Sequence, residues 1–448
     1  MASLQTQLAV VGAGPGGYAA AFYAADRGLQ VSLIDPAPNP GGVCLYRGCI
    51  PSKALLHVAD VLNEAKHAES WGVSFGQPKI DIDKVRAFKD KVVAQLTGGV
   101  GQVGRMRKIN YIQGLAEFAD PRTLKITREG QKSAETLGFE HAIVATGSRP
   151  ATVPGLSIDS PRVMDSTAAL GSKVTVVEMT GGLLPGADRD LVNILARRVE
   201  SMCEAVLLNT KVVSVKEGKS GLSVTFEGQL PEGMPKERSF DRVLVSVGRK
   251  PNSAVPGLDK TAVKVNQRGF IDVDPARRTA EPTIYAIGDV VGEPMLAHKA
   301  SHEARVAVEA ILGERVAFEP LAIPAVVFTD PELAWCGLTE ADAEREKREV
   351  TVTRFPWGAS GRAITLDRTD GMTKLVIDPK TERVLGVGIV GRGAGELISE
   401  GVLAVEMGAN ATDVKLSIHP HPTLSETLME SAEVFFGQAT HVFKPKRK

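Results

Sequence analysis

A glycine turn near the start of the chain most strongly limits the folds available to it. Gly12-x-Gly14-x-x-Gly17 follows the apolar stretch 8–11 and opens an Ala-rich helical stretch. The first glycine of such a turn permits a tight bend, the second lets a pyrophosphate approach the backbone, and the third allows close packing of helix and strand. Asp35 ends the next apolar stretch, where an acidic side chain binds a ribose hydroxyl. This βαβ pattern predicts a dinucleotide-binding unit.

Further strands are predicted along the chain, and several of them end close to a glycine. They lie at 142–145, 173–177, 242–245 and 283–287. Strands that alternate with helical stretches indicate parallel α/β sheets. From about residue 323 the pattern changes to a meander and then a helix, which indicates a separate α+β domain. A second glycine pattern, Gly386 to Gly391, lies within this meander, and because no helix follows at once we do not expect it to bind a dinucleotide.

The charge balance argues against nucleic-acid and membrane-surface partners. The 448 residues include 53 Lys+Arg and 53 Asp+Glu, and 5% of them are aromatic. No net field therefore attracts a polyanion, and few side chains can stack on bases. Residues 1–25 carry no charge, but no basic residue precedes the apolar run and the glycine turn interrupts it. We therefore expect neither a signal peptide nor a membrane span, and a cytoplasmic location.

Two of the four cysteines lie close together. Cys44 and Cys49 are separated by four residues, about one helical turn, so their sulfurs can face each other. A helix N-terminus at that place would lower the pKa of a thiol and make it a good nucleophile. Zinc would need two further ligands, and no second Cys or His pair at metal spacing stands nearby. From the residues alone, a redox pair and two inert core cysteines both remain open.

The C-terminal part holds a compact group of two histidines and a glutamate, His419, His421 and Glu426. The prolines around His421 keep it out of a helix, while Thr423 or Ser425 can begin one. Glu426 can then return toward the His421 ring and orient it as a general base requires. A metal site at the two histidines and histidines that are merely at the surface are the alternatives.

Taken together, these segments resemble the flavoprotein disulfide reductases, and most closely the dihydrolipoyl dehydrogenases among them. The resemblance covers nearly the whole chain and rests on the segments 12–17, 41–53, 145–150, 285–289, 295–298 and 419–426. It implies an α/β fold with FAD-binding and NAD-binding Rossmann-like domains and an α+β C-terminal dimerisation domain. The implied limits are an FAD-binding domain with the redox disulfide at 1–150, a truncated NAD-binding domain at 151–270, a return segment completing the FAD domain at 271–320, and an interface domain at 321–448.

The resemblance also implies a role for each reacting residue. Cys44 is implied to be the thiol that exchanges with the substrate, and Cys49 the thiol against the flavin. His421, held by Glu426, is implied to take the dithiol proton and to reach the cysteines of the other subunit in a homodimer. The implied reaction oxidises the dihydrolipoyl groups of 2-oxoacid dehydrogenase complexes through FAD and passes hydride to NAD.

The cofactor contacts follow from the same resemblance. FAD is expected at Gly12, Gly14, Gly17, Asp35, Gly42, Cys44, Lys53, Gly114, Thr146, Gly147, Asp289 and Ala297, and NAD at Glu178, Val212 and Gly248. No metal ligand is expected. A mercuric reductase would carry a C-terminal Cys pair, which is absent here, and Met295-Leu-Ala-His298 is closer to the lipoamide enzymes than to glutathione reductase. Tyr46-Arg47 departs from the Asn-Val usual between the two cysteines, which bears on substrate tuning.

The second dinucleotide unit is incomplete. The stretch 171–178 is typical of a strand that ends in the ribose-binding acid, Glu178, and no Lys or Arg follows at once, which favours NAD over NADP. The glycine turn belongs about 20 residues earlier, yet 155–161 contains no Gly-x-Gly. Roughly 30 residues, one strand, turn and helix, are therefore missing after Leu170. We expect weak NAD binding, and a non-catalytic complex subunit or a flavin–dithiol enzyme with another acceptor are the alternative functions.

Overall fold

The computed structural model describes residues 4–128, 130, 133–153, 155–156, 160, 162–164 and 173–443. Contacts divide the chain into two compact units, each built from two separate stretches. The first compact unit comprises Met1–Ala168 and Arg242–Glu319, and the second comprises Ala169–Asp241 and Pro320–Lys448. The junction after Leu170 lies outside the described residues, and the domain limits given above remain predictions.

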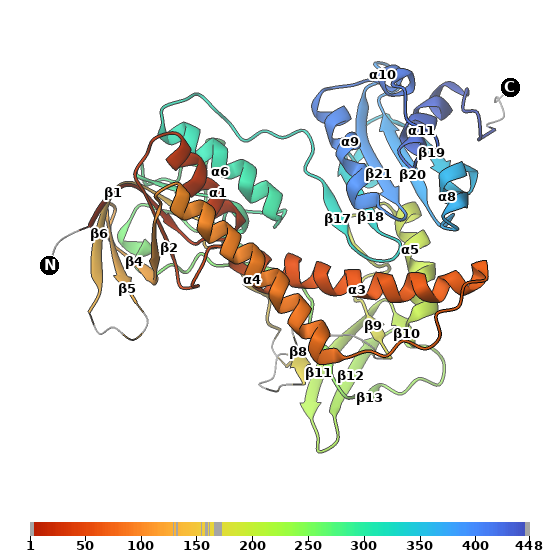
Figure 1. Cartoon of the computed structure of the whole chain (residues 1–448), viewed down its shortest axis with the longest axis horizontal. Helices are drawn as coiled ribbons and strands as arrows, with labels where there is room; N and C mark the ends of the chain where they lie inside the picture. Colours follow the sequence, from red (N-terminus) through yellow and green to blue (C-terminus); the bar gives the residue numbers. More distant parts are fainter. Residues whose placement is uncertain are drawn as a thin grey trace. The chain divides into compact units, whose positions relative to one another are not determined.

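The first compact unit is built around a mixed seven-stranded sheet (Figure 1). Its strands are β1 (Leu4–Val11), β2 (Val31–Asp35), β3 (Asn110–Gln113), β4 (Leu115–Asp120), β5 (Thr123–Thr127), β6 (Glu135–Val144) and β16 (Ile284–Ala286). The order is β3-β2-β1-β6-β5-β4, and β16 also pairs with β6. The pairings among β1, β2, β3, β6 and β16 are parallel, whereas β4 and β5 form an antiparallel arm. The carboxyl ends of β1, β2 and β6 therefore meet at one edge of the sheet, where a dinucleotide site is expected.

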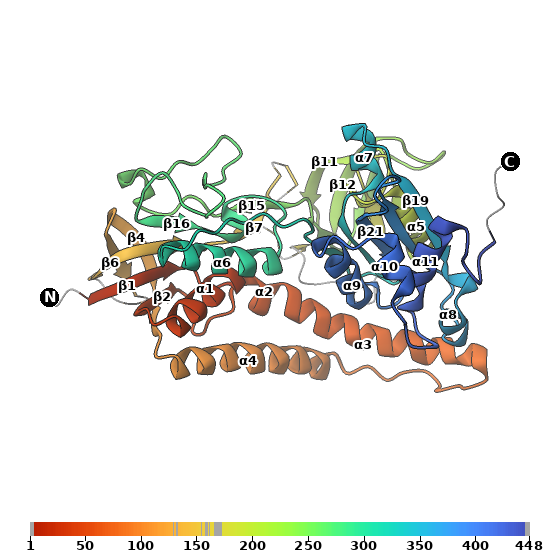
Figure 2. The ribbon, with the colours of Figure 1, turned by 90° about the horizontal axis from the view of Figure 1, so that it is seen from above.

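The helices of this unit differ in how they pack. They are α1 (Pro15–Asp26), α2 (Gly42–Arg47), α3 (Cys49–His67), α4 (Ile82–Met106) and α6 (Ala297–Ile311), with the 3-10 turns η1 (Ala68–Trp71), η2 (Leu258–Lys260) and η3 (Gly288–Val290). Pro15 opens α1, since its fixed φ suits the first helical position. The buried glycines and alanines of α1 allow this helix to pack closely on β1 and α6. In Figure 2, α3 and α4 run side by side as a long antiparallel pair.

Two short strand pairs complete the first compact unit. They are β7 (Ser148–Pro150) with β15 (Arg249–Pro251), and β8 (Val163–Met164) with β14 (Val243–Leu244). The segment that carries β16 and α6 returns to this unit from late in the sequence, because β16 pairs with β6.

The C-terminal part of the second compact unit is a five-stranded antiparallel sheet in the order β17-β18-β21-β20-β19. Its strands are β17 (Ala325–Val327), β18 (Leu333–Gly337), β19 (Thr351–Pro356), β20 (Met372–Ile377) and β21 (Val384–Val390). Its helices are α7 (Glu340–Glu346), α8 (Gly361–Thr365), α9 (Ala394–Glu406), α10 (Ala411–Leu416) and α11 (Glu426–Phe436), with the 3-10 turn η4 (Trp357–Ala359). The second glycine pattern runs along β21 and its end, which confirms that it is part of a sheet.

The remainder of the second dinucleotide unit, here called the residual segment (173–241), lies in this same compact unit. It consists of β9 (Thr175–Val177), α5 (Arg189–Met202), β10 (Ala205–Leu207), β11 (Thr210–Glu217), β12 (Leu222–Gly228) and β13 (Glu237–Phe240). In the described chain β9 and β10 form a parallel sheet of two strands, and β11, β12 and β13 form an antiparallel sheet. Leu191 and Val192 of α5 are buried in one apolar cluster with Leu333 and Val390 of the C-terminal sheet.

Candidate active site

The predicted glycine turn leaves no space for larger side chains. Gly12 has a φ of +99°, and a Cβ on it would lie 2.4 Å from the carbonyl oxygen of Ala145. A Cβ on Gly17 would lie 1.8 Å from the carbonyl oxygen of Gly12. The first turn of α1 carries neither a capping side chain nor an acidic residue. Free N–H groups at such a helix start bind phosphate, so this turn fits the pyrophosphate of a dinucleotide.

The predicted ribose-binding acid is fixed beside this turn. The carboxylate of Asp35 accepts the N–H of Ala13 at 2.7 Å and the N–H of Ala37 at 2.9 Å. The N–H of Gly114 donates to the carbonyl oxygen of Asp35 at 3.0 Å, which brings a second predicted FAD residue to the same strand end. The carboxylate is thereby held at the end of β2, where the ribose of a dinucleotide is bound.

The cysteine motif packs directly on the glycine turn. Gly42 has a φ of +57°, and a Cβ on it would lie 2.5 Å from the Cα of Gly14. The N–H of Gly41 donates to the carbonyl oxygen of Ala13 at 2.8 Å. Only glycines permit this close approach. The segment that carries the thiols therefore begins beside the position predicted to bind the pyrophosphate.

The continuous helical turn that the spacing of the cysteines predicts is not formed. α2 ends at Arg47, and Cys49 begins α3. Gly48 between them has a φ of −128° and a ψ of −109°, which is not a helical conformation, so the helix breaks there. The prediction of a thiol at a helix N-terminus is nevertheless confirmed for Cys49, and the positive end of the helix dipole stabilises a thiolate at this position.

The two cysteines do not form a disulfide, and a hydrogen bond joins their side chains. The Cys44 thiol donates a hydrogen bond to Cys49, which raises the pKa of Cys44 above its ordinary value and lowers the pKa of Cys49 to about 6. The ammonium group of Lys53, one turn further along α3, also lowers the pKa of Cys49. Cys49 is thus a thiolate at neutral pH. Burial instead raises the pKa of Cys203, and that of Cys336 to about 12, as expected for inert thiols.

Asp289 is held by two residues that sequence reasoning missed. The Ser148 hydroxyl donates to Oδ2 of Asp289 at 2.5 Å. Arg249 donates from Nε to the Ser148 hydroxyl at 2.6 Å and from Nη2 to the Ser148 carbonyl oxygen at 2.8 Å. The other predicted FAD residues of this unit are Thr146 and Gly147 after β6, Lys53 on α3 and Ala297 at the start of α6. Since Ser148 and Arg249 lie 101 residues apart, no local pattern could have indicated this contact.

A buried glutamate fixes the turn that carries Asp289. Glu303 on α6 is 0% exposed, and its Oε2 accepts the N–H of Gly288 at 2.6 Å. Lys299 Nζ and Arg277 Nη1 lie 3.1 and 2.9 Å from its Oε1. These partners compensate the buried carboxylate, which would otherwise be costly to remove from water. The sequence places Lys299 four residues before Glu303 on one helix. This spacing is equally common on exposed helix faces, so it did not indicate that Glu303 is buried.

The predicted base and its carboxylate lie together at the start of α11. His421 Nδ1 lies 2.9 Å from Oε1 of Glu426, and the N–H of Thr423 donates to Oε2 at 2.8 Å. Ser425, one of the two residues predicted to begin this helix, lies at the N-cap position of α11, although its side chain makes no capping hydrogen bond there. Partial burial raises the pKa of Glu426, but the Thr423 N–H and the His421 ring outweigh it, so the pKa lies below its usual value. The His421 side chain is 74% exposed, and its ring can therefore reach a second molecule.

The alternative metal pair of two histidines is not formed. The rings of His419 and His421 contact different carboxylates, Glu400 on α9 and Glu426 on α11. Each ring is thus engaged by its own element of the second compact unit, and the two do not converge on one ion.

The residues expected to bind NAD are divided between the two compact units. Glu178 follows β9 as predicted, and its carboxylate accepts the N–H of Thr180 at 2.8 Å. Val212 lies on β11, paired with Phe226 of β12. Gly248 precedes β15 in the first compact unit and has a φ of +102°. The acid is present, but the sequence contains no Gly-x-Gly between 148 and 248, so the residues do not fit the pyrophosphate of NAD.

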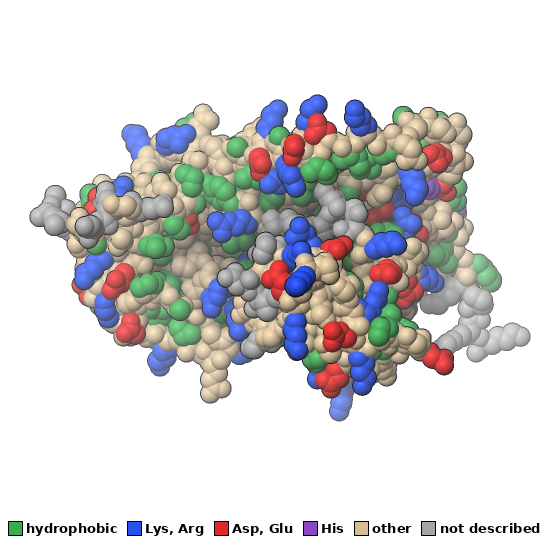
Figure 3. Space-filling model, turned by 90° about the horizontal axis from the view of Figure 1, so that it is seen from below, with side chains coloured by type: hydrophobic (Ala, Val, Ile, Leu, Met, Phe, Trp, Pro, Cys, Tyr) green, Lys and Arg blue, Asp and Glu red, His purple; other side chains and the backbone are tan. Residues whose placement is uncertain are grey.

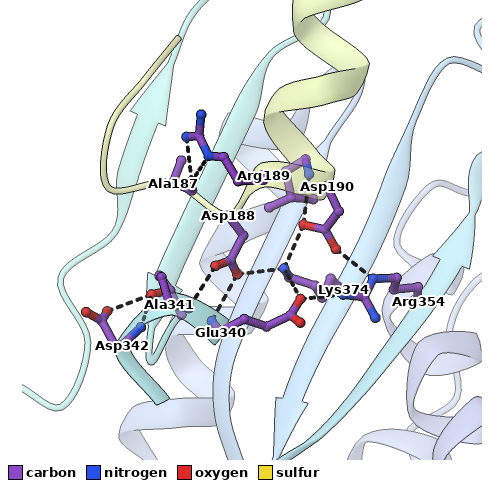
Figure 4. Close-up of polar contacts among 11 residues, drawn as sticks. Ala187, Asp188, Arg189, Asp190, Glu340, Ala341, Asp342, Arg354 and Lys374 are labelled. Atoms are coloured by element: carbon purple, nitrogen blue, oxygen red, sulfur yellow. Dashed lines mark hydrogen bonds and ion pairs between the residues drawn. The ribbon is translucent and has the colours of Figure 1, made fainter. Parts of the chain in front are cut away.

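A buried lysine joins the residual segment to the C-terminal sheet (Figure 4). Lys374 on β20 is 1% exposed, and its Nζ lies 2.6, 2.8 and 2.7 Å from carboxylate oxygens of Asp188, Asp190 and Glu340. Arg354 on β19 pairs with Asp190 and Glu340 as well. Such a group of carboxylates can hold a cation, and here the ammonium group takes that place.

The surface shows no gathering of one charge on the face drawn in Figure 3. Lys and Arg side chains alternate with Asp and Glu over this face. Such a mixture produces little long-range field. No helix in the described part of the chain is long and apolar enough to cross a membrane.

Two family models match the chain. Residues 6–169 and 163–304 match the model described as pyridine nucleotide-disulphide oxidoreductase. Residues 323–432 match the model of the dimerisation domain of pyridine nucleotide-disulphide oxidoreductases. The first model is matched in two pieces that meet at 163–169, close to the predicted break in the second dinucleotide unit.

Curated relatives are similar over almost the full chain. The dihydrolipoyl dehydrogenases of Vibrio cholerae and Haemophilus influenzae are 44% and 45% identical, with 99% of this chain and 98% of each relative covered. That of Geobacillus stearothermophilus is 40% identical, with 98% of each covered. The first two alignments span 473 positions against 448 residues here, so at least 25 of those positions have no counterpart in this chain. This difference is close in size to the roughly 30 residues predicted to be missing.

Solved structures share the fold. The HOCl-induced flavoprotein disulfide reductase RclA from Escherichia coli is 25% identical, with a TM-score of 0.82 over 96% of this chain and 99% of that chain. LpdA from Mycobacterium tuberculosis is 24% identical, with a TM-score of 0.85 over 96% of this chain and 99% of that chain. These likenesses confirm the predicted α/β fold with a C-terminal α+β domain.

Proposed function

The chain belongs to the pyridine nucleotide-disulphide oxidoreductase family, and from this we propose that it acts as an FAD-dependent dihydrolipoyl dehydrogenase. It oxidises protein-bound dihydrolipoyl groups through Cys44 and Cys49. The observation that carries the proposal is the thiol pair formed by Cys44 in α2 and Cys49 at the start of α3, in a segment that packs on the glycine turn through Gly42. The identity of 40% to 45% with dihydrolipoyl dehydrogenases over nearly the whole chain supports the choice of substrate.

Dithiol oxidation starts from the Cys44–Cys49 disulfide. Nδ1–H of His421 donates to Glu426, so Nε2 accepts the proton of one dihydrolipoyl thiol. The resulting thiolate attacks Sγ of Cys44. A substrate–Cys44 disulfide forms, the Cys44–Cys49 bond breaks, and the electron pair remains on Cys49 as a thiolate. The lowered pKa of Cys49, about 6, makes it a good leaving group.

The second step releases the oxidised product. The other dihydrolipoyl thiol attacks the substrate sulfur of the mixed disulfide and closes the lipoyl disulfide, while its proton passes to the departing sulfur of Cys44. The pair then holds a Cys44 thiol and a Cys49 thiolate, and one proton remains on His421. This is the arrangement of the free pair, in which the Cys44 thiol donates to Cys49.

The first compact unit offers the residues that would hold FAD. The glycine turn and Asp35 suit its pyrophosphate and ribose, and Asp289 suits its ribityl-phosphate region. FAD, when bound, would supply a two-electron acceptor for the thiol pair and a hydride donor for the final acceptor. Lys53 and Arg249 place positive charge beside Cys49 and stabilise its thiolate.

The base is supplied by a second copy of the chain. Residues 323–432 match a dimerisation domain, and His421 is 74% exposed in one copy. A homodimer in which His421 of one subunit serves the thiols of the other accounts for both observations. The further partners are the lipoyl-bearing proteins of 2-oxoacid dehydrogenase complexes, and the location is the cytoplasm.

The incomplete second dinucleotide unit favours a second candidate, a flavin–dithiol enzyme that passes its electrons to an acceptor other than NAD. The sequence contains no Gly-x-Gly between 148 and 248, and the strand and helix on either side of that turn are predicted to be missing with it. Without the turn, no close backbone approach to the pyrophosphate is available. A dissociation constant for NAD close to that of an intact relative would contradict this second candidate.

One titration distinguishes the two candidates. Purified protein with bound flavin is titrated anaerobically with dihydrolipoamide, and NAD⁺ is then added while the absorbance spectrum is recorded. A long-wavelength flavin–thiolate band after the first addition supports the dithiol chemistry, and its absence contradicts the proposed function. Return of the oxidised spectrum with NAD⁺ supports the dehydrogenase, whereas a band that persists with NAD⁺ and disappears with a dye acceptor supports the second candidate.

A further inference from the structure

A second histidine–carboxylate pair lies immediately before the proposed base. His419 is two residues from His421 and differs from it in exposure, because its side chain is 6% exposed and that of His421 is 74% exposed. Neither the dithiol chemistry nor cofactor binding described above uses His419. A buried polar ring must be satisfied by hydrogen bonds, so its partners show what it holds in place.

Both ring nitrogens of His419 face oxygen atoms that can only accept. Nδ1 lies 2.8 Å from the carbonyl oxygen of Ser417, and Nε2 lies 2.7 Å from Oε1 of Glu400. The ring is therefore held at two separate atoms, by the backbone at Nδ1 and by the Glu400 side chain at Nε2. A hydrogen bond to a carboxylate is shorter and stronger than one between neutral groups.

These contacts connect the base segment to two helices. Ser417 caps the end of α10, and Glu400 lies in the middle of α9. α9 is firmly placed, since Ile398 and Val405 are buried in the core of the C-terminal domain. His419 therefore anchors the segment before His421 to α9 and α10.

Glu426 anchors the same segment from the other side. It accepts the Thr423 N–H at 2.8 Å and contacts the His421 ring at 2.9 Å from the start of α11. All of these residues lie in the second compact unit. The exposed His421 ring is thus carried by a short segment that is fixed at both ends, by Glu400 through His419 and by α11 through Glu426.

We propose that His419, held by Glu400, is a positioning residue that directs the His421 ring toward the dithiol substrate. This proposal rests on the proposed function, because it assumes that His421 is the base. The ring of an exposed base has to be held within a fraction of an ångström of its productive place, and its displacement by about 1 Å can lower a rate by up to about a hundredfold.

Three substitutions of His419 distinguish the contact of its ring with Ser417 from its contact with Glu400. His419→Ala removes both, His419→Asn retains a donor near Ser417, and His419→Gln retains a donor that reaches Glu400. We expect the rate of anaerobic flavin reduction by dihydrolipoamide, measured by stopped flow, to fall by between about tenfold and a hundredfold in His419→Ala. The loss should be smaller in His419→Asn and smallest in His419→Gln. The KM for dihydrolipoamide should stay nearly constant in all three variants. Glu400→Ala should match His419→Asn.

A double-mutant cycle distinguishes positioning from general damage. If His419 acts through His421, His419→Ala should cause no further loss of rate in a His421→Gln background. Arg348→Gln provides a control, since Arg348 pairs with Asp378 in the same domain and neither residue belongs to the base segment or to α9, α10 and α11. We expect this control to reduce flavin at the wild-type rate.

Two results would overturn the inference. One is a rate in His419→Ala within about twofold of the wild type, which is too small for loss of alignment. The other is a loss of equal size in the wild-type and His421→Gln backgrounds. Failure of the wild-type holoenzyme to reduce its flavin with dihydrolipoamide would instead contradict the proposed function, so the two failures are distinguishable.

Discussion

The chain contains two segments of the same dinucleotide-binding type, and they differ in what supports them. In the first, β1, α1 and β2 belong to a seven-stranded sheet, and Asp35 is fixed to the glycine turn through Ala13. In the residual segment, β9 pairs with β10 in a sheet of two strands, and Glu178 bonds to Thr180 nearby. A βαβ unit without its first strand and turn thus keeps its acid but loses the position where a pyrophosphate binds.

The comparison also shows how a reduced segment can remain attached. A two-stranded parallel sheet has too little apolar surface to be stable alone. In the second compact unit α5 packs on the C-terminal sheet through Leu191, and its first turn pairs with the buried Lys374. The residual segment therefore depends on its neighbour, whereas the first segment is supported by its own sheet. The following predictions test this contrast.

The largest expected effect is the loss of dithiol oxidation when the thiol pair beside the first segment is broken. Cys49→Ser should lower the rate of dihydrolipoamide oxidation by at least about a thousandfold, because the reacting thiolate is removed. Flavin content should not change. The matched control is Cys203→Ser, at the end of α5, which should retain the wild-type rate. Equal losses in the two variants would show that the chemistry is not confined to Cys49.

Next in size is the loss of flavin from the first segment. Gly17→Ala places a Cβ 1.8 Å from the carbonyl oxygen of Gly12, so α1 cannot keep its position. We expect the flavin-to-protein absorbance ratio to fall close to zero. Gly28→Ala is the control, since a Cβ there meets nothing within 4 Å and causes backbone strain alone at a φ of +90°. Retention of flavin by Gly17→Ala would contradict the predicted pyrophosphate site.

For the residual segment, the substitution Lys374→Met tests the ion pairs that attach it to the C-terminal sheet. It removes the ammonium group from Asp188, Asp190 and Glu340, and the buried Asp188 carboxylate keeps only two backbone N–H donors, so the free energy of unfolding should fall by about 3 kcal/mol, as for a broken buried ion pair. Urea denaturation should show this loss in the second compact unit, with flavin still bound to the first. Lys380→Met, at a site 83% exposed, should change the free energy of unfolding by less than about 0.5 kcal/mol. Similar values for both variants would show that this cluster does not hold the segment.

The pH dependence of the reduced thiol pair gives a smaller effect with a definite sign. The pKa of Cys49 is lowered to about 6, so the thiolate predominates above pH 6 and is lost as the pH falls through this value. The alkylation rate by iodoacetamide should therefore be nearly constant above pH 7 and fall about tenfold per unit below pH 6. In Cys44→Ala the donor is missing, and the midpoint should move upward. An unchanged midpoint would show that the hydrogen bond from Cys44 does not lower the pKa.

Asp35 and Glu178 lie at the end of the equivalent strand in the two segments. Their substitution gives the smallest expected effect and the most direct comparison of the segments. Asp35→Asn should weaken FAD binding by about tenfold, since the charge that binds ribose at a formed site is lost. Glu178→Gln should change the affinity for NADH by less than about twofold, because no turn completes that site. Isothermal titration of the flavin-free and flavin-bound proteins measures the two affinities. A tenfold loss in both variants would indicate that the residual segment still binds NAD as an intact unit does.

Local spacing was enough to predict several parts of the site. The turn at Gly12 and the acid at Asp35 were predictable, because binding a pyrophosphate and a ribose imposes these residue types at fixed distances along one strand and helix. The pairing of His421 with Glu426 was predictable for the same reason, since only four residues of chain separate them. The break of the helix at Gly48 was not, because a single glycine does not show which backbone conformation it will adopt.

What the sequence by itself determined is therefore the chemistry that short stretches can encode, namely the dinucleotide turn, the thiol pair, the base with its carboxylate and the absence of a second turn. The tertiary structure decided which distant residues support that chemistry. Lys374 meets Asp190 across 184 positions, and Arg249 meets Ser148 across 101 positions. A charged residue that will be buried has the same local pattern as one at the surface. Its role depends on partners that only folding brings within hydrogen-bond distance.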